Sequence, residues 1–295
     1  MGEIVADFPL AGHNVDWLHR EDIRPYIFVR EHNRDKAMVQ PKSLGWFPQA
    51  PLIFSPMQMD EVHFANQILA LENLAFSHSD MAMPRWVFYD CGVMPGFVAG
   101  FAQRTKTLAP GVKSILKPSE TMEWTPISLF IIIPTMAPRE WVAHNLCSIN
   151  SLLPRENRFY GLGFLSKAFG LWQADIDICC GITQWKSPAI RLHSHYGRFE
   201  VLTAFTPVHD YSHTITYRLK VDFNQWMKFF SKEDDIEFLN EHEYAGFEVD
   251  PNDESSLIAF QRKIEEKGET YYLNSTELRH NPLDHPLKVY KSLNK

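Results

Sequence analysis

The spacing of apolar side chains along the chain alternates between a helical period and a strand period. In MDEVHFANQILALENLAF, residues 59–76, apolar residues recur every three or four positions, which predicts a helix with Asp60 as its N-cap. GFLSKAFGLWQ, residues 163–173, predicts a second helix by the same spacing. Shorter apolar runs bounded by Gly, Pro and polar residues predict strands over residues 51–57, 85–90, 97–103, 127–134, 141–153, 176–185, 199–209 and 213–223.

Residues between these runs predict how the elements connect. CGVMPG separates the second and third strands by a short turn, which indicates a hairpin, and residues 104–126 carry prolines and charges typical of a loop. Residues 187–197 predict a short helix capped by Ser187, and residues 255–268 predict another helix with a serine cap. The order of strands and helices favours an α+β fold with a mixed, mostly antiparallel central sheet flanked by helices.

Changes in composition divide the chain into three predicted regions. Residues 1–45 mix charged and aromatic side chains without clear periodicity and are interpreted as an N-terminal extension. The regular alternation of strands and helices covers residues 46–225. Residues 226–295 begin with an acidic stretch and are interpreted as an acidic C-terminal extension.

Composition and charge narrow the class of protein. The 295 residues are 45% hydrophobic and 22% charged, which is enough apolar material for a sizeable core. A formal net charge of −7 provides no strong basic field, so nucleic acid is not expected as a main partner. The four cysteines lack CxxC spacing and are interpreted as reduced thiols. The N-terminus lacks a signal-peptide pattern and no apolar run is long enough to span a bilayer, so a cytoplasmic protein is expected.

One stretch, RENRFYGLGF at residues 155–164, places two glycines between a predicted strand and a predicted helix. A helix start leaves backbone N–H groups unpaired at the positive end of the helix dipole, and glycines let phosphate oxygens approach them. The stretch predicts a pyrophosphate site made by Arg158, Phe159, Tyr160, Gly161, Leu162 and Gly163. A tight turn without a ligand is the alternative, because Ser166 stands where a dinucleotide-binding fingerprint has its third glycine.

Two longer sequence motifs resemble those of a known family: the first contains this turn, and the second follows it. L-P-x(3)-R-x-x-G-x-G, at a strand end before a helix, resembles motif A of the GCN5-related N-acetyltransferase (GNAT) superfamily, which holds the pyrophosphate of acetyl-CoA or acyl-CoA. P-A-I-x-L-H-x-x-Y-G-x-F-E-V, residues 188–201, is similar to the motif B helix and strand of that superfamily. The expected order of elements agrees over roughly residues 50–220. The chain departs from the pattern at Lys186, where motif B has asparagine.

The resemblance implies direct transfer of an acetyl or longer acyl group from acyl-CoA to an amine. A backbone N–H of the strand over residues 141–153 would polarise the thioester carbonyl, with the donor lying between that strand and the strand over residues 176–185. His144 is the candidate base for the amine proton, because imidazole titrates near neutral pH, with Asn145 or Ser148 as a relay through water.

The acid that protonates the departing thiolate is predicted to be His193, which stands where the superfamily has a tyrosine. Tyr196 is the nearby substitute. The acceptor stays open between a small-molecule amine and a peptide amine, and the sequence leaves a homodimer open.

Two other functions and a metal site compete with this hypothesis. IIIP followed by GFLSK faintly resembles acetoacetate decarboxylase, in which Lys167 would form a Schiff base with a keto acid. An acyl-CoA-binding module without turnover is the second alternative. The histidines at 193, 195, 209 and 213 have metal-compatible spacing, but residues two apart on a short helix diverge, so no metal is expected.

Overall fold

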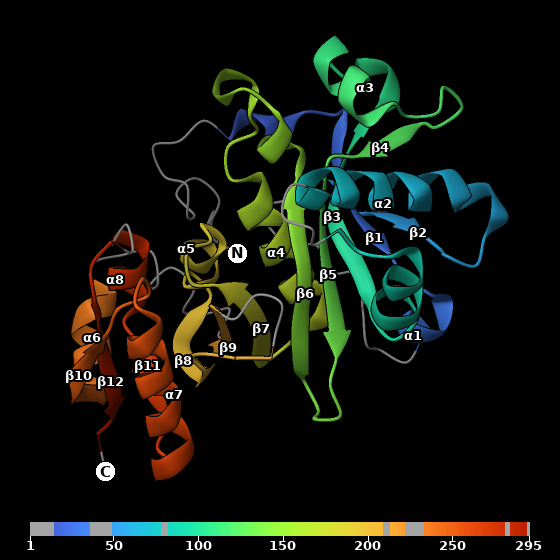
Figure 1. Cartoon of the computed structure of the whole chain (residues 1–295). Helices are drawn as coiled ribbons and strands as arrows, with labels where there is room; N and C mark the ends of the chain where they lie inside the picture. Colours follow the sequence, from blue (N-terminus) through green and yellow to red (C-terminus); the bar gives the residue numbers. More distant parts are fainter. Residues whose placement is uncertain are drawn as a thin grey trace. The chain divides into compact units, whose positions relative to one another are not determined.

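The computed structural model describes residues 15–35, 49–77, 82–208, 213–221, 233–280 and 284–293. The chain folds as two compact units, Met1–Ile176 and Asp177–Lys295 (Figure 1). Every residue of the predicted pyrophosphate site, and the candidate base His144, belongs to the first unit. The candidate acids His193 and Tyr196 belong to the second.

Strands of the first unit form a sheet with the order β6-β5-β3-β1-β2, and β4 pairs with β3. The pair β1–β2 is parallel, and the other described pairs of this unit are antiparallel. The strands are β1 (Ile23–Phe28), β2 (Leu52–Phe54), β3 (Phe97–Arg104), β4 (Trp124–Pro126), β5 (Ser128–Pro134) and β6 (Glu140–Ser148).

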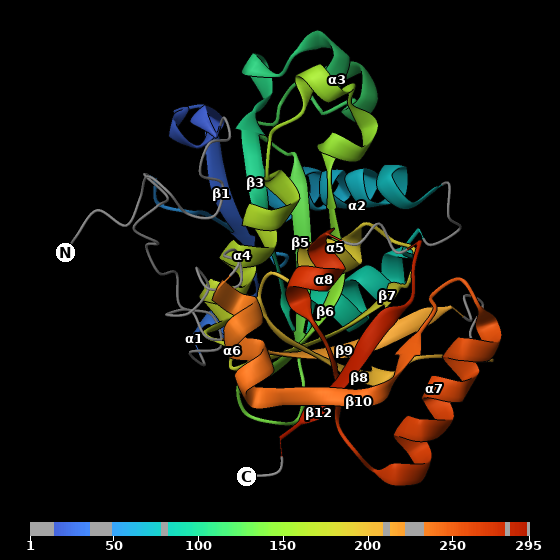
Figure 2. The ribbon, with the colours of Figure 1, turned by 90° about the vertical axis from the view of Figure 1, so that its left-hand side faces the viewer.

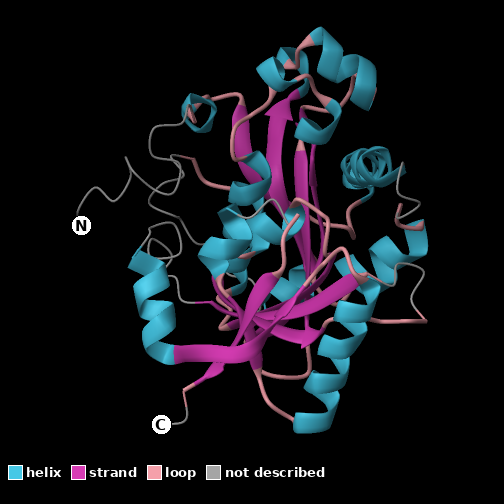
Figure 3. Cartoon of the chain, turned by 60° about the vertical axis from the view of Figure 1, so that its left-hand side comes forward, coloured by secondary structure: helices cyan, strands magenta, loops and turns pink. Residues whose placement is uncertain are grey.

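Two long helices cover this sheet on opposite faces, α2 (Val62–Phe76) and α4 (Leu162–Ala174); Figure 2 labels them, and Figure 3 shows the same arrangement from another side. A Cβ added to Gly170 of α4 would lie 2.5 Å from the Phe130 ring, so the close approach of α4 to β5 requires glycine at that position. The shorter helices are α1 (Glu31–Asp35), α3 (Pro110–Leu116), the 3-10 turns η1 (Asp16–His19), η2 (Met59–Glu61), η5 (Thr105–Thr107), η6 (Ile149–Leu152) and η7 (Arg155–Asn157), and the π-helix η4 (Val87–Val93).

The second unit contains an antiparallel sheet with the order β10-β12-β11-β8-β9-β7. Its strands are β7 (Ile178–Gln184), β8 (Gly197–Thr203), β9 (Thr214–Val221), β10 (His242–Val249), β11 (Tyr271–Leu273) and β12 (Leu287–Ser292). In Figure 2, α6 leads directly into β10 and α7 follows that strand. The helices are α5 (Ala189–His193), α6 (Glu233–Glu241), α7 (Glu254–Lys267) and α8 (Ser275–His280).

This architecture confirms the predicted fold class, a mixed and mostly antiparallel sheet flanked by helices. The prediction of a strand over residues 85–90 is wrong, because that segment enters the π-helix η4, in which the Met94 N–H donates to the Tyr89 carbonyl. The strand preference of aromatic residues reflects burial on a packed surface, and a helix that buries Phe88 satisfies the same requirement.

Other local predictions are wrong in detail. The expected loop over residues 104–126 contains α3, which starts with Pro110, and the strand β4. Asp60 lies in η2, and Glu61 occupies the N-cap position of α2, although its side chain makes no capping hydrogen bond to the helix. The cap of α7 is the Asp253 side chain, which accepts from the Ser255 N–H, rather than a serine.

The predicted division of the chain into three regions has both boundaries in segments that the structure does not describe. One boundary follows residue 45, within residues 36–48, and the other follows residue 225, within residues 222–232. The three-region division therefore stays a prediction beside the two compact units.

Candidate functional site

The glycine turn between β6 and α4 is held by hydrogen bonds from within the first unit. The Asn150 side chain donates to the Phe159 carbonyl at 2.6 Å and accepts from the Phe159 N–H at 2.9 Å. Gly161 is the N-cap of α4 with φ of 70°, a left-handed conformation that glycine adopts without the strain of a Cβ. The turn therefore has a fixed backbone, and glycine at position 161 is explained by conformation alone.

Two groups at this turn are available to an anion. The Leu162 N–H donates to the Phe159 carbonyl, whereas the Gly163 N–H has no hydrogen-bond partner among the residues that the structure describes. Gly163 is half-exposed in the first turn of α4, where the helix dipole is positive. The Arg158 Nε donates to the Leu153 carbonyl at 3.0 Å, and this contact leaves the rest of the exposed guanidinium available.

A cavity of about 770 Å³ lies beside the turn and is closed in part by the N-terminal segment. The Trp17 Nε1–H donates to the Tyr160 carbonyl at 2.9 Å, and the Trp17 ring packs edge-on against Phe159. Arg155 and Arg158 also line this cavity. Exposed guanidinium groups beside aromatic rings suit a ligand that carries both phosphate and a flat ring.

A third arginine, Arg20, lines the same cavity but is already paired. Its guanidinium donates to both Asp22 carboxylate oxygens, at 2.9 and 2.6 Å. The hydrogen bond from Arg20 is the main reason that the pKa of Asp22 is lowered to about 2. Arg155 and Arg158 are therefore the cations through which this cavity can attract an anion.

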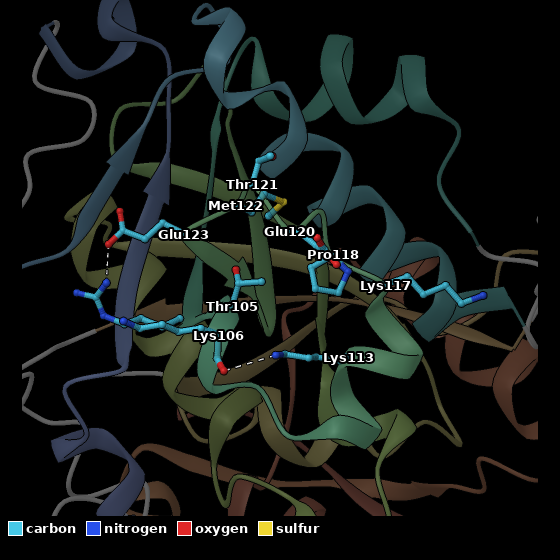
Figure 4. A pocket seen from close by; sticks show the side chains of 10 residues that line it. Thr105, Lys106, Lys113, Lys117, Pro118, Glu120, Thr121, Met122 and Glu123 are labelled. Atoms are coloured by element: carbon cyan, nitrogen blue, oxygen red, sulfur yellow. Dashed lines mark hydrogen bonds and ion pairs between the residues drawn. The ribbon is translucent and has the colours of Figure 1, made fainter.

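A second cavity of about 770 Å³ lies between α3 and the ends of β3 and β4 (Figure 4). Lys106, Lys113 and Lys117 line it, and the Lys113 Nζ lies 3.5 Å from the Lys106 carbonyl oxygen. Arg104 at its edge pairs with Glu123 at 2.5 Å. None of the predicted site residues lines this cavity.

The strand β6 is interrupted at the candidate base. Asn145 pairs with Ile131 and Ala143 pairs with Ile132, so His144 is an extra residue without a partner in β5. Such a β-bulge leaves one residue out of the ladder and re-aims its side chain and backbone groups. Bulges of this kind occur often beside active sites, and this one falls on the strand that leads to the glycine turn.

His144 is linked through Asn145 to a buried carboxylate on α2. The His144 Nδ1 lies 3.0 Å from the Asn145 Oδ1, and the Asn145 Nδ2 donates to the Glu72 Oε1 at 2.7 Å. Desolvation lowers the pKa of His144 below its ordinary 6.5, against an opposing contribution from the hydrogen bond with Asn145. His144 is therefore a neutral imidazole near neutral pH, as a base must be.

Sequence reasoning missed Glu72. Its side chain is 0% exposed, and it stands four residues after Ile68 on the apolar face of the helix. A carboxylate at an apolar position of an amphipathic pattern is the signal that could have identified it, because buried charges are retained where they are paired. Burial raises the pKa of Glu72, while hydrogen bonds from Met83 and Asn145 lower it.

Replacing Glu72 by glutamine is expected to change how stability depends on pH. The raised pKa means that the folded state holds the proton more tightly, so wild-type stability is lost as the pH rises from 4.5 through the folded pKa. Glutamine does not ionise. Urea titrations should therefore show the unfolding free energy of Glu72→Gln increasing relative to that of wild type across this pH window. The expected increase is about 1.4 kcal/mol for each pH unit that the window spans. A difference in unfolding free energy that is constant with pH would contradict this.

The candidate acids lie inside the second unit. His193, at the end of α5, is 6% exposed, and its ring centroid lies 5.1 Å from that of Tyr217. Tyr196 is 0% exposed just before β8. The alternative Schiff-base residue, Lys167, is also 0% exposed, within α4 of the first unit.

The remaining histidines form no cluster with metal-ligand geometry in the described ranges. His213 is paired with Glu254 at 3.0 Å, and His209 lies outside the described residues. No group of three His, Cys, Asp or Glu side chains gathers within the part of the chain that the structure describes. Among the same residues, no helix is long and apolar enough to cross a membrane.

Comparison with known proteins gives matches in structure only. No family model and no curated protein matches the chain. A chain of the NatC complex bound to Gag peptide and CoA aligns at 12% identity and a TM-score of 0.37, over 57% of this chain and 96% of that chain. The ribosomal-protein-S18-alanine N-acetyltransferase from Escherichia coli aligns at 10% identity and a TM-score of 0.35, over 57% and 92%.

A GNAT family acetyltransferase from Elizabethkingia anophelis with acetyl-CoA bound aligns at 10% identity and a TM-score of 0.32, over 68% of this chain and 100% of that chain. Acetyltransferases of the superfamily that the two motifs resemble are thus among the matching structures.

Proposed function

We propose that the protein is an acyltransferase that moves an acetyl or longer acyl group from acyl-CoA to an amine. The main observation behind the proposal is that a β-bulge in β6 and a glycine turn follow one another along the chain. A β-bulge at His144 exposes a candidate base, and the chain then enters a glycine turn whose Gly163 N–H is without a partner in the described ranges. The two motifs quoted above support the same function.

The donor would be held by its diphosphate at the glycine turn. The Gly163 N–H and the Arg158 guanidinium supply hydrogen-bond donors, and the helix dipole of α4 adds partial positive charge. Arg155 lines the adjoining cavity and adds a further cation. Phosphate binding of this type places the donor by backbone geometry, so that the acyl group can be positioned along β6.

The chemical step is direct attack of a neutral amine on the thioester carbonyl carbon. A C–N bond forms, the C–S bond breaks, and the amine proton passes to the His144 Nε2. A backbone N–H at the bulge would stabilise the carbonyl oxygen as negative charge develops on it. The departing thiolate would receive a proton from His193 or Tyr196, a role that rests on the resemblance to the superfamily alone.

The test is a transfer assay with acetyl-CoA and a long-chain acyl-CoA against amino acids, polyamines and N-terminal peptides. We expect free thiol and N-acylated product to appear in equal amounts with at least one acceptor. CoA binding with no transfer to any of these amines would favour the non-catalytic module. Trapping of Lys167 by borohydride with a keto acid would favour the decarboxylase, which requires that a substrate reach a side chain with no exposed surface.

A further inference from the structure

The contacts of Glu72 show which way its neighbour Asn145 is oriented. The Met83 N–H lies 3.2 and 3.0 Å from the two Glu72 carboxylate oxygens, so Glu72 acts as an acceptor toward the backbone. In its ionised form the Glu72 carboxylate has no hydrogen to donate. The Asn145 atom that faces the Glu72 Oε1 at 2.7 Å must therefore be the amide nitrogen, because two acceptors would repel at that distance.

The orientation of the Asn145 amide determines the tautomer of His144. With its nitrogen toward Glu72, Asn145 presents its carbonyl Oδ1 to the His144 Nδ1 at 3.0 Å. A carbonyl oxygen only accepts, so the neutral ring must carry its proton on Nδ1. The lone pair is then on Nε2. The His144 side chain is exposed, and its Nε2 has no hydrogen-bond partner among the residues that the structure describes.

From this chain of contacts we propose that Glu72 is a positioning residue for the transfer reaction. Acting through Asn145, it fixes the proton of His144 on Nδ1 and leaves Nε2 as the base that accepts the amine proton. The assignment of His144 as base rests on the proposed function, whereas the tautomer is a property of the unliganded protein. In triads of nucleophile, base and orienting group, the third member has the same task of holding an imidazole in one tautomer.

A glutamine at position 72 would remove this restraint while keeping the shape of the side chain. Its amide can turn its nitrogen toward Asn145, which lets the Asn145 amide reverse and present its own nitrogen to the His144 Nδ1. That arrangement places the His144 proton on Nε2 and removes the basic lone pair from the exposed nitrogen. Alanine at position 145 would also break the link and leaves Glu72 bonded to Met83.

The test is long-range ¹H–¹⁵N correlation NMR of the full chain labelled with ¹⁵N-histidine, at a pH above the ordinary histidine pKa. His144→Gln identifies the His144 signals by their loss. We expect wild type to show a protonated Nδ1 and a bare Nε2. We expect Glu72→Gln to lose this single state, and Asn145→Ala to shift the proton toward Nε2.

Two controls separate the tautomer from a general disturbance of the fold. Glu61→Gln changes another carboxylate of the same segment, one that accepts from the Ser55 N–H, and should leave the His144 signals unchanged. The signals of His213, which pairs with Glu254 at 3.0 Å, should stay in place in each variant. A wild-type His144 protonated on Nε2 would overturn the proposal, and so would an unchanged Nδ1 proton in both Glu72→Gln and Asn145→Ala.

Activity measurements distinguish this proposal from the proposed function. With an active wild type, Glu72→Gln should lower kcat by about tenfold or more and leave the KM for acyl-CoA unchanged. If the wild type has no transferase activity but shows the expected tautomer, the proposed function is rejected, while the chain of hydrogen bonds from Glu72 to His144 stands. An active enzyme whose kcat does not respond to Glu72→Gln would reject the positioning role alone.

Discussion

Replacing His144 by glutamine is expected to lower kcat for acyl transfer by about 10²- to 10⁴-fold, the usual contribution of a general base. Glutamine retains a polar side chain of similar length but cannot accept the amine proton near neutral pH. Because His144 is exposed and stands out of the β5–β6 ladder, the fold should not depend on it. Steady-state kinetics at saturating acyl-CoA measure the loss, and thermal unfolding of the variant should match wild type.

The pH dependence of the rate provides a second test of His144. The neutral ring is the active form, and the pKa of His144 is lowered below 6.5 by desolvation. The rate should therefore rise with pH through a pKa below 6.5, separately from any rise at higher pH as the acceptor amine loses its own proton. His144→Gln should lack this acid limb. An identical limb in the variant would assign the titration to another group and would contradict the role of His144.

Replacing Gly163 by proline is expected to weaken CoA binding about 10- to 100-fold. Proline removes the backbone N–H that has no partner in the described part of the chain, and the first turn of a helix tolerates proline because its N–H groups are unpaired there. A hydrogen bond to a charged group contributes about 1.5–3 kcal/mol, which corresponds to that range of affinity. Isothermal titration calorimetry with CoA measures the change.

Gly163→Ala is the matched control, because alanine retains the N–H and favours the helix. It should bind CoA far better than Gly163→Pro does. Valine at Gly161 is a poorer test, because φ of 70° strains a β-branched residue and unfolding would accompany any lost affinity. Equal CoA affinity in Gly163→Pro and Gly163→Ala would exclude the Gly163 N–H as a phosphate donor.

Periodicity in the sequence was sufficient to predict the elements on which the site is built. The helices over residues 59–76 and 163–173 appear as α2 and α4, and the run beginning near residue 141 appears as β6. The turn that precedes α4 was predicted from two glycines, because their conformational freedom is a property of the residue type itself. Patterns of this length are informative because a whole face of an element must be apolar to pack.

The parts of the site that depend on tertiary contacts were not predictable in the same way. No local signal places Trp17 against Tyr160, which is 143 residues further along the chain. The bulge at His144 depends on the register between β5 and β6, which alternation in one strand does not determine. The link from Glu72 to Asn145 joins a helix to a strand 73 residues away. The sequence alone therefore shows only that a carboxylate occupies an apolar position of the helix.

The most direct test of the account is a calorimetric titration of the wild-type protein with CoA and with pantetheine, which has the same thiol arm without the diphosphate. We expect CoA to bind at one site per chain and pantetheine to bind at least about 100-fold more weakly, since the charge-assisted contacts at Arg158 and Gly163 are lost. Equal affinity for the two ligands, or no heat with either, would contradict the claim that the start of α4 holds the diphosphate of an acyl carrier.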